Sequence, residues 1–223
     1  MLTINTELIK SSFEFWDKID EETREYFLQS IALVNYSQGD NIYSALNDCV
    51  GVMLVKSGGL RTYILSEDGR DVTLYRLRPG DICILSASCL LKNITFDVYI
   101  DAEVDSEVYM INSYTYSKIQ EKNVYVENFS LKLAVDRFSD VMWAIEQMLF
   151  MKMDRRLATF LFDEAAKSNT HNIKMTHEQM AKYVGSAREV ISRMLKQFER
   201  DGLIEMKRGG LRITDMEKLK GLL

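Results

Sequence analysis

The apolar residues of this chain change their spacing twice, and these changes restrict the fold more than any other feature of the sequence. Between residues 35 and 111, short runs rich in β-branched and aromatic residues alternate with turn signals such as Pro79-Gly80-Asp81. Strands separated in this way are typical of antiparallel barrels and jelly rolls. Residues 2–34 and the chain after residue 113 have apolar residues at helical spacing instead. The sequence therefore predicts an α+β fold with an N-terminal antiparallel β-roll between helical segments.

The helical segment from Val124 to Met148 carries apolar residues at alternating steps of three and four. This spacing is the a/d pattern of a two-stranded coiled coil, so it predicts a long dimerisation helix and a homodimer. Val135, Met142 and Leu149 widen the seam on one flank. The alternative is that the seam packs on the β-roll of its own chain. The predicted dimer-interface residues are Leu131, Ala134, Phe138, Val141, Ile145 and Met148.

The net charge of −5 conceals an uneven distribution. Residues 151–223 contain 15 Lys or Arg and 10 Asp or Glu, a balance of +5, whereas residues 1–150 contain 13 and 23, a balance of −10. Attraction to phosphate is local, so the acidic average does not exclude binding to nucleic acid. We expect three parts: residues 1–122 form N-terminal helices and an effector-sensing β-barrel, residues 123–150 a dimerisation helix, and residues 151–223 a DNA-binding domain.

The C-terminal part has the pattern helix, helix, turn, helix, hairpin, which is typical of a winged helix-turn-helix. Thr176 with Gln179 and Ser186 with Glu189 predict two capping boxes. Gly185 between them can adopt the positive φ of a tight turn. The last of these helices would expose a polar side suited to base edges in the major groove. The candidate DNA-binding residues are Arg188, Glu189, Ser192, Arg193, Lys196, Thr176 and Ser186, with Lys207 and Arg208 in the basic wing.

Two of these assignments have simpler alternatives. Glu189 would stabilise its helix as the partner in a capping box whether or not it contacts DNA. Arg188 and Arg193 would also be accommodated on an ordinary solvated helix face. The clustering of two arginines, a carboxylate and a hydroxyl directly after a turn favours base contact, because arginine suits guanine and a carboxylate accepts from cytosine.

In the order barrel, long helix and winged helix-turn-helix, the chain resembles the CRP/FNR family of bacterial transcription regulators. The stretch "VGSAREVISRML" is similar to that family's recognition-helix motif, hydrophobic-Gly-x-x-x-Glu-x-x-x-Arg, and "SGGLRTYILSEDGRDVTLYRLRPGD" resembles its barrel hairpins. The resemblance covers the chain from about Val34 to Leu211. It implies a cyclic-nucleotide-binding-like barrel, a homodimer, an inverted-repeat site in double-stranded DNA, and contact with RNA polymerase. It also implies that Arg188, Glu189, Ser192 and Arg193 occupy base-reading positions.

The known effector chemistries of the family do not fit this barrel. Members that bind cyclic nucleotides use a Gly-Glu-Leu stretch followed by an Arg-Ser-Ala stretch, where this chain has Leu85 and Phe96-Asp97. A carboxylate at that place would repel a phosphate, so cAMP is not expected. No cysteine precedes Cys49, whereas an iron–sulfur cluster needs about four thiolates. Haem is not expected either, because both histidines follow residue 150.

The effector itself is left open by the sequence. The stretch "CILSASC" would hold two cysteines buried as small apolar residues, a thiol switch, or serines that bind a polar molecule. A thiol-based redox protein that uses Cys83 and Cys89, a protein-binding helix-turn-helix module and a constitutive DNA-binding protein are the alternative functions. The candidate effector-pocket residues are Cys83, Leu85, Ser86, Ser88, Cys89, Phe96 and Asp97.

Several function classes are not expected. Two histidines and no Cys-x-x-Cys pair do not predict a metal site. No Cys/His arrangement predicts a nucleophilic enzyme. The sequence has no uncharged apolar run of about 18 residues that would span a membrane, and its first residues are unlike a secretory signal. A cytoplasmic location is therefore expected.

Overall fold

The computed structural model describes residues 4–44, 50–84 and 97–223. The chain forms two compact units. The first contains Met1–Leu65 and Leu74–Met142, and the second contains Ser66–Thr73 and Trp143–Leu223.

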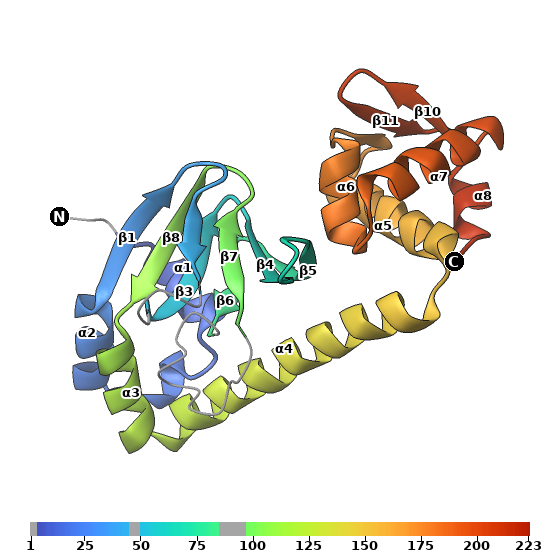
Figure 1. Cartoon of the computed structure of the whole chain (residues 1–223). Coiled ribbons are helices and arrows are strands. Elements are labelled where there is room, and N and C mark those ends of the chain that lie inside the picture. The colour runs from blue at the N-terminus through green and yellow to red at the C-terminus, as the bar shows by residue number, and fades with distance from the viewer. Residues whose placement is uncertain (1–3, 45–49, 85–96) are drawn as a thin grey trace. The chain divides into compact units, whose positions relative to one another are not determined.

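The strands of the N-terminal part form two antiparallel four-stranded sheets (Figure 1). One sheet has the order β1-β8-β3-β6, and in the other the order is β2-β7-β4-β5. The buried side chains of Met53, Leu60, Ile100 and Val108 belong to one core between strands of both sheets. This is the predicted β-roll. The strands are β1 (Ile31–Tyr36), β2 (Asn41–Tyr43), β3 (Val52–Ser57), β4 (Leu60–Leu65), β5 (Asp71–Leu77), β6 (Ile82–Cys83), β7 (Tyr99–Ala102) and β8 (Ser106–Ile111).

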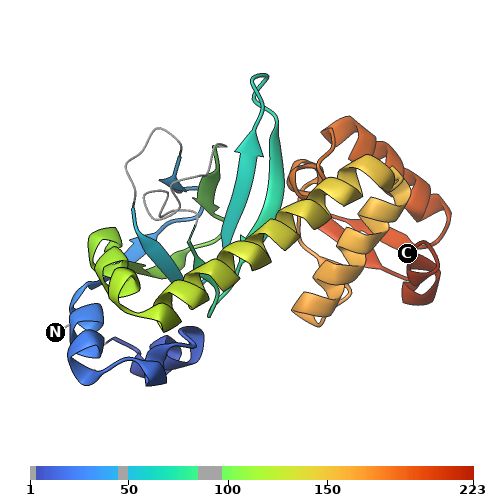
Figure 2. The ribbon, with the colours of Figure 1, turned by 90° about the horizontal axis from the view of Figure 1, so that it is seen from below.

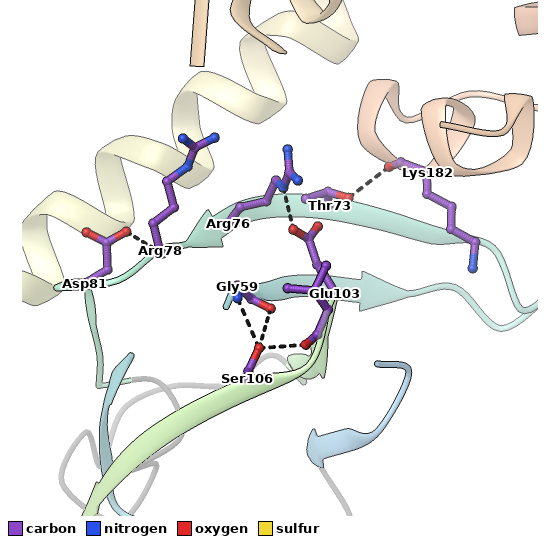
Figure 3. Close-up of polar contacts among 9 residues, drawn as sticks. Gly59, Thr73, Arg76, Arg78, Asp81, Glu103, Ser106 and Lys182 are labelled. Atoms are coloured by element: carbon purple, nitrogen blue, oxygen red, sulfur yellow. Dashed lines mark hydrogen bonds and ion pairs between the residues drawn. The ribbon is translucent and has the colours of Figure 1, made fainter. Parts of the chain in front are cut away.

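Polar contacts fix the turns of the roll (Figure 3). Gly58 has a φ of +87°, and a Cβ there would come within 2.3 Å of the Ser106 hydroxyl. The absence of a side chain at Gly58 lets the Ser106 oxygen accept a hydrogen bond of 3.0 Å from the Gly59 amide. The Arg76 guanidinium donates to the Glu103 carboxylate at 2.8 Å. The tight β3–β4 turn is thus connected to the start of β8, and the ion pair connects β5 to the residue that follows β7.

A group of aromatic rings joins the N-terminal helices to the start of the long helix. Phe13, Phe15, Phe27 and Phe129 lie with ring centroids 5.1–5.9 Å apart. Figure 2 shows the N-terminal helices on one side of the roll, beside the start of the long helix. The helices are α1 (Thr6–Ser12), η1 (Trp16–Lys18), α2 (Glu21–Gln29), α3 (Ser113–Lys122) and α4 (Val124–Phe150).

The helical prediction for residues 2–34 is wrong at its end. The chain becomes extended at Ile31, because residues 31–36 pair with β8 in antiparallel register from Ile31↔Ile111 to Tyr36↔Ser106. The strand ladder provides hydrogen-bond partners that local apolar spacing does not reveal.

The C-terminal unit is built on its own core, in which Leu161, Ile191, Leu195 and Leu211 are buried. A small antiparallel sheet of order β10-β11-β9 completes it. A Cβ on Gly210 would come within 2.1 Å of the Ile173 carbonyl, so only glycine allows β11 to lie this close to β9. The elements are α5 (Met153–Ser168), β9 (Asn172–Ile173), α6 (His177–Val184), α7 (Arg188–Arg200), β10 (Ile204–Lys207), β11 (Gly210–Ile213) and α8 (Met216–Lys220).

Candidate nucleic-acid interface

The turn between α6 and α7 is closed by backbone and side-chain hydrogen bonds. At the start of α6 the Thr176 hydroxyl accepts from the Gln179 amide at 3.1 Å, and the Gln179 side chain accepts from the Thr176 amide at 2.8 Å. The first predicted capping box is therefore confirmed. At the end of α6, Gly185 has a φ of +65°, as the sequence predicts for this turn.

The second predicted capping box is wrong. The residue that precedes α7 in the cap position is Ala187, and it makes no side-chain cap hydrogen bond. Ser186 lies one residue too early, because its amide donates to the Ala181 carbonyl at 2.9 Å and so ends α6. Glu189 is consequently not the partner of a cap, although its carboxylate still lies in the first turn of α7, where the helix dipole favours a negative charge.

Arg156 on α5 forms hydrogen bonds with backbone carbonyls of this turn. Its guanidinium donates to the carbonyls of Val184 at 2.6 Å and Gly185 at 3.0 Å, and to the Met148 carbonyl at 3.3 Å. Burial lowers the pKa of Arg156 from its ordinary value, although an arginine at any physiological pH stays charged. The sequence analysis did not identify this residue, because only the crossing of α5 and α6 reveals which of the adjacent Arg155 and Arg156 points inward.

The amphipathic helix α7 separates a buried side from a charged one. Ile191, Leu195 and Phe198 are buried in the core. The opposite side forms a shallow hollow of about 550 Å³. Five of the predicted DNA-binding residues line this hollow together with Arg200, which the sequence analysis missed; the full lining is Arg188, Glu189, Ser192, Arg193, Lys196 and Arg200.

A second hollow, of about 410 Å³, lies between the start of α6, the start of α7 and the wing. It brings the predicted residues Thr176 and Lys207 beside Arg188, which lines both hollows. Arg208 is exposed at the tip of the β10–β11 hairpin, and Ser186 is partly buried in the turn, outside the lining of both hollows. Lys207 forms an ion pair with Glu205 on its own strand.

His177, at the first position of α6, contacts the charged side of α7. Its Nδ1 lies 2.7 Å from the hydroxyl of Ser192. Burial lowers the pKa of His177 below its ordinary value, and the nearby charges of Arg188 and Lys196 lower it further. His177 was not among the predicted site residues. Its place directly after the cap of α6 is visible in the sequence, but its contact with α7 is not.

The helix α4 exposes an apolar stripe that differs from the predicted seam. The exposed fractions are 56% for Leu131, 62% for Val135, 64% for Phe138, 45% for Met142 and 69% for Leu149. Of the predicted interface residues, Leu131 and Phe138 belong to this stripe, whereas Ala134, Val141, Ile145 and Met148 are partly buried.

The reason is packing within the chain. Val141 packs against the core of the β-roll, and the sulfur of Met148 lies 3.2 Å from where a Cβ of Gly185 would be. The exposed stripe passes instead through Val135, Met142 and Leu149, the flank of the predicted seam.

The predicted effector pocket falls mostly outside the described residues, since Leu85, Ser86, Ser88, Cys89 and Phe96 lie there. Of its other members, Cys83 is buried with an exposed fraction of 0%, and Asp97 is exposed.

Thr62 and Tyr75, which are buried in the roll, form a polar cluster with the partly buried Arg137 of α4. The guanidinium carbon of Arg137 lies 4.9 Å from the centroid of the Tyr75 ring. Among the described residues, no hydrogen-bond partner is found for Thr62 Oγ1, Tyr75 Oη or Arg137 Nε. Burial raises the pKa of Tyr75 well above its ordinary value and the neighbouring Cys83 raises it further, against the opposing effects of Thr62 and Arg137.

Two features of the described residues concern membranes and metal ions. None of their helices is both long and apolar enough to cross a membrane. They contain no group of three or more His, Cys, Asp or Glu side chains that could hold a metal ion.

Comparison with known proteins agrees with this architecture. Residues 155–222 match the family model of the Crp-like helix-turn-helix domain, and residues 33–123 match that of the cyclic nucleotide-binding domain. The transcriptional regulatory protein btr of Bordetella pertussis is 24% identical over 215 residues, covering 93% of this chain and 84% of that protein. The cAMP-activated global transcriptional regulator Vfr of Pseudomonas aeruginosa is 22% identical, covering 77% of this chain and 84% of that protein.

A solved structure is similar over nearly the whole chain. It is that of a protein from Eubacterium rectale assigned to the crp/fnr family of transcriptional regulators, with a TM-score of 0.91. Its sequence is 40% identical to this one, and the match covers 96% of this chain and 99% of that chain. The two proteins are therefore similar in sequence as well as in fold over almost their whole length. The two family models match this chain in the order cyclic nucleotide-binding domain, then helix-turn-helix domain. The chain belongs to the CRP/FNR family of transcription regulators, as the resemblance of its recognition helix and barrel hairpins implied.

Proposed function

We propose that this regulator acts in the cytoplasm as a homodimer that places two copies of α7 in the major groove of an inverted-repeat DNA site, and that it acts on RNA polymerase. The observation that carries the proposal is the charged side of α7. Arg188, Glu189, Ser192 and Arg193 line one hollow on the side opposite the buried core. A recognition helix presents its N-terminal residues to base edges in this way.

The residues of the interface would divide into two roles. Arg188, Glu189, Ser192 and Arg193 would read bases, since guanidinium, carboxylate and hydroxyl groups each match particular base edges. Thr176, Ser186, Lys196, Lys207 and Arg208 would contact the DNA backbone, which positions the protein without reading sequence.

A pair of substitutions separates these roles. Arg193→Ala should cost about 1–3 kcal/mol on the specific site and relax the preference at one base position. Lys207→Ala should weaken binding to all sequences alike. It should also reduce the slope of log affinity against log salt concentration by about 1, the value expected for one lost phosphate contact. The measurement is a titration of each variant with the selected site and with random DNA at several salt concentrations.

Equal losses on specific and random DNA for Arg193→Ala would remove the base-reading assignment. Retention on heparin without any selection of a DNA sequence from a random pool would instead favour a protein-binding helix-turn-helix module.

We further propose that a small molecule in the β-roll, other than cAMP, controls the DNA affinity. The support is the polar cluster of Thr62, Tyr75 and Arg137, which joins β4 and β5 to α4. Arg137 also donates to the Asp140 carboxylate at 2.7 Å, but its Nε and the two hydroxyls are buried without a hydrogen-bond partner among the described residues. Such atoms are costly, and a ligand with a hydrogen-bond-accepting anionic group would satisfy them. The exposed fraction of 0% at Cys83 favours a bound molecule over a thiol signal, because a reactive thiol must be accessible.

The test is to select bound DNA in the presence of candidate metabolites or of mild peroxide. An anionic metabolite should change DNA affinity in the wild type, and Arg137→Gln should abolish that change. If peroxide changes the affinity and mass spectrometry finds a Cys83–Cys89 linkage or a sulfenate, the redox signal replaces the ligand.

A further inference from the structure

The contact between His177 and Ser192 joins a titratable ring to the base-reading side of α7. His177 is at the start of α6 and Ser192 is in the middle of α7, and 2.7 Å separates Nδ1 of the ring from the hydroxyl oxygen. Ser192 lies on the same side of α7 as Arg188 and Lys196, one turn away from each, and all three line the charged hollow. His177 therefore forms a hydrogen bond with Ser192, the one uncharged side chain among the described residues that line this hollow.

A serine hydroxyl has a single proton to give. A neutral imidazole either accepts that proton at Nδ1, when its own hydrogen is on Nε2, or donates from Nδ1 in the other tautomer. A protonated imidazole has hydrogens on both nitrogens and only donates. The direction of the His177–Ser192 hydrogen bond thus depends on the charge of the ring whenever the neutral ring has its hydrogen on Nε2.

We propose that the protonation of His177 decides whether Ser192 offers DNA a hydrogen-bond acceptor or a donor. The inference rests on the proposed contact between Ser192 and a base. With His177 neutral and its hydrogen on Nε2, Ser192 donates to Nδ1 and presents its lone pairs to an amino group of cytosine or adenine. When the ring takes a proton from solvent, Nδ1 donates to Ser192, and the serine proton is free for an acceptor of guanine or thymine.

The charges around His177 set when this change occurs. Arg188 and Lys196 face it from α7, Lys207 lines the adjoining hollow from the wing, and Glu178 is its neighbour on α6. Burial and the two α7 cations lower the pKa of His177 in the free protein, so the ring is neutral at pH 7. Phosphates of a bound DNA would offset these cations and favour the charged ring. The change should therefore be seen in the DNA complex, as the pH falls towards and below the ordinary histidine pKa of about 6.5.

The test is a selection from random DNA by the full chain at pH 8.0 and at pH 5.5, followed by titration of the selected sites. The wild type should shift its preference at one base position of each half-site from cytosine or adenine towards guanine or thymine. The shift should be roughly twofold to tenfold in relative affinity, which is the value of one neutral hydrogen bond. His177→Gln, which does not titrate, should show no shift and should unfold at the same temperature as the wild type.

His171→Gln is the matched control. His171 is the other histidine of the chain and is exposed in the same unit. This variant should keep the shift, and Ser192→Ala should lose it.

The outcomes separate the inference from the function on which it rests. If Ser192→Ala selects the same sequence as the wild type at pH 8.0, Ser192 reads no base, and both the inference and the proposed base-reading role of Ser192 fail. If Ser192→Ala changes the selected sequence but the wild type shows no shift with pH, only the role of His177 fails. A shift that persists in His177→Gln also rules that role out.

Discussion

The Arg156 guanidinium donates hydrogen bonds to three backbone carbonyls. Two of them, at Val184 and Gly185, lie at the end of α6, and the third, at Met148, lies near the end of α4. Carbonyls at a helix end have no intrahelical donor, and the planar guanidinium offers several donors at once. Arg156 thereby fixes the turn that precedes α7.

We predict that Arg156→Ala lowers the free energy of unfolding by about 2–3 kcal/mol, because charged hydrogen bonds to partly buried carbonyls are lost. Arg156→Lys should lose less, since an ammonium group reaches one carbonyl but not all three. Denaturant unfolding of the full chain measures both. Arg155→Ala, at the exposed neighbour, should stay within about 0.5 kcal/mol of the wild type. Similar losses for both arginines would show that the turn does not depend on Arg156.

Some residues of the candidate site could be predicted from the sequence, and others could not. Arg188, Glu189, Ser192 and Arg193 were predictable as a group, because one helix with a buried side must expose the other. The contacts of Arg156 and His177 were not predictable, since each depends on where one helix crosses another. The alternation of apolar and polar residues along a helix contains no information about that crossing.

At the scale of elements, α7 begins without a side-chain cap. Its cap position is occupied by Ala187, although serine, threonine, asparagine or aspartate is preferred there. The sequence predicted a cap one residue earlier because Ser186 and Glu189 have the spacing of a capping box. The amide of Ser186 instead completes the end of α6. Two short helices joined by a tight turn compete for the same residues, and sequence spacing does not decide between them.

We predict that Ala187→Ser raises the free energy of unfolding by about 0.5–1 kcal/mol, because its hydroxyl can accept a hydrogen bond from an amide in the first turn of α7. Ser186→Ala should change it by less than about 0.5 kcal/mol. Thermal unfolding of both variants measures the two effects. A loss of about 1 kcal/mol for Ser186→Ala, with no gain for Ala187→Ser, would mean that α7 is capped by Ser186 as the sequence suggested.

For the long helix α4, too, the sequence left two possibilities open. Its heptad spacing was evident in the sequence, but two neighbouring seams satisfied it. The roll selects between them, since Val141 packs into its core and leaves Val135 and Met142 exposed. Local spacing therefore predicted the helix and its apolar side, and tertiary packing determined which residues remain for a partner.

At the scale of the whole molecule, the unequal charges of the two parts are consistent with different tasks. The basic balance of +5 in residues 151–223 favours contact with phosphates, whereas residues 1–150 have a balance of −10. Regulators of this family form homodimers, and two recognition helices can then contact half-sites about 34 Å apart. The exposed stripe of α4 is our proposed surface for that association.

We predict that Phe138→Asp converts the protein to a monomer, because it places a charge in the middle of the exposed stripe. Affinity for an inverted repeat should fall by more than about tenfold, because a monomer binds one half-site and loses the second contact that a dimer makes. Sedimentation and titration with one or two half-sites measure the two effects. Ser139→Asp adds the same charge at an exposed polar position one residue further on and should remain a dimer. A dimeric Phe138→Asp protein would exclude this stripe as the interface.

The glycine at position 210 limits how such a regulator can diversify. Its backbone approaches the Ile173 carbonyl too closely for any side chain, whereas the basic residues at the tip of the same hairpin are exposed to solvent. Mutations that adapt the wing to new promoters are therefore expected at its exposed tip and not at Gly210. Drift at the tip can retune affinity gradually, but a side chain at Gly210 would separate β11 from β9 and affect every promoter at once.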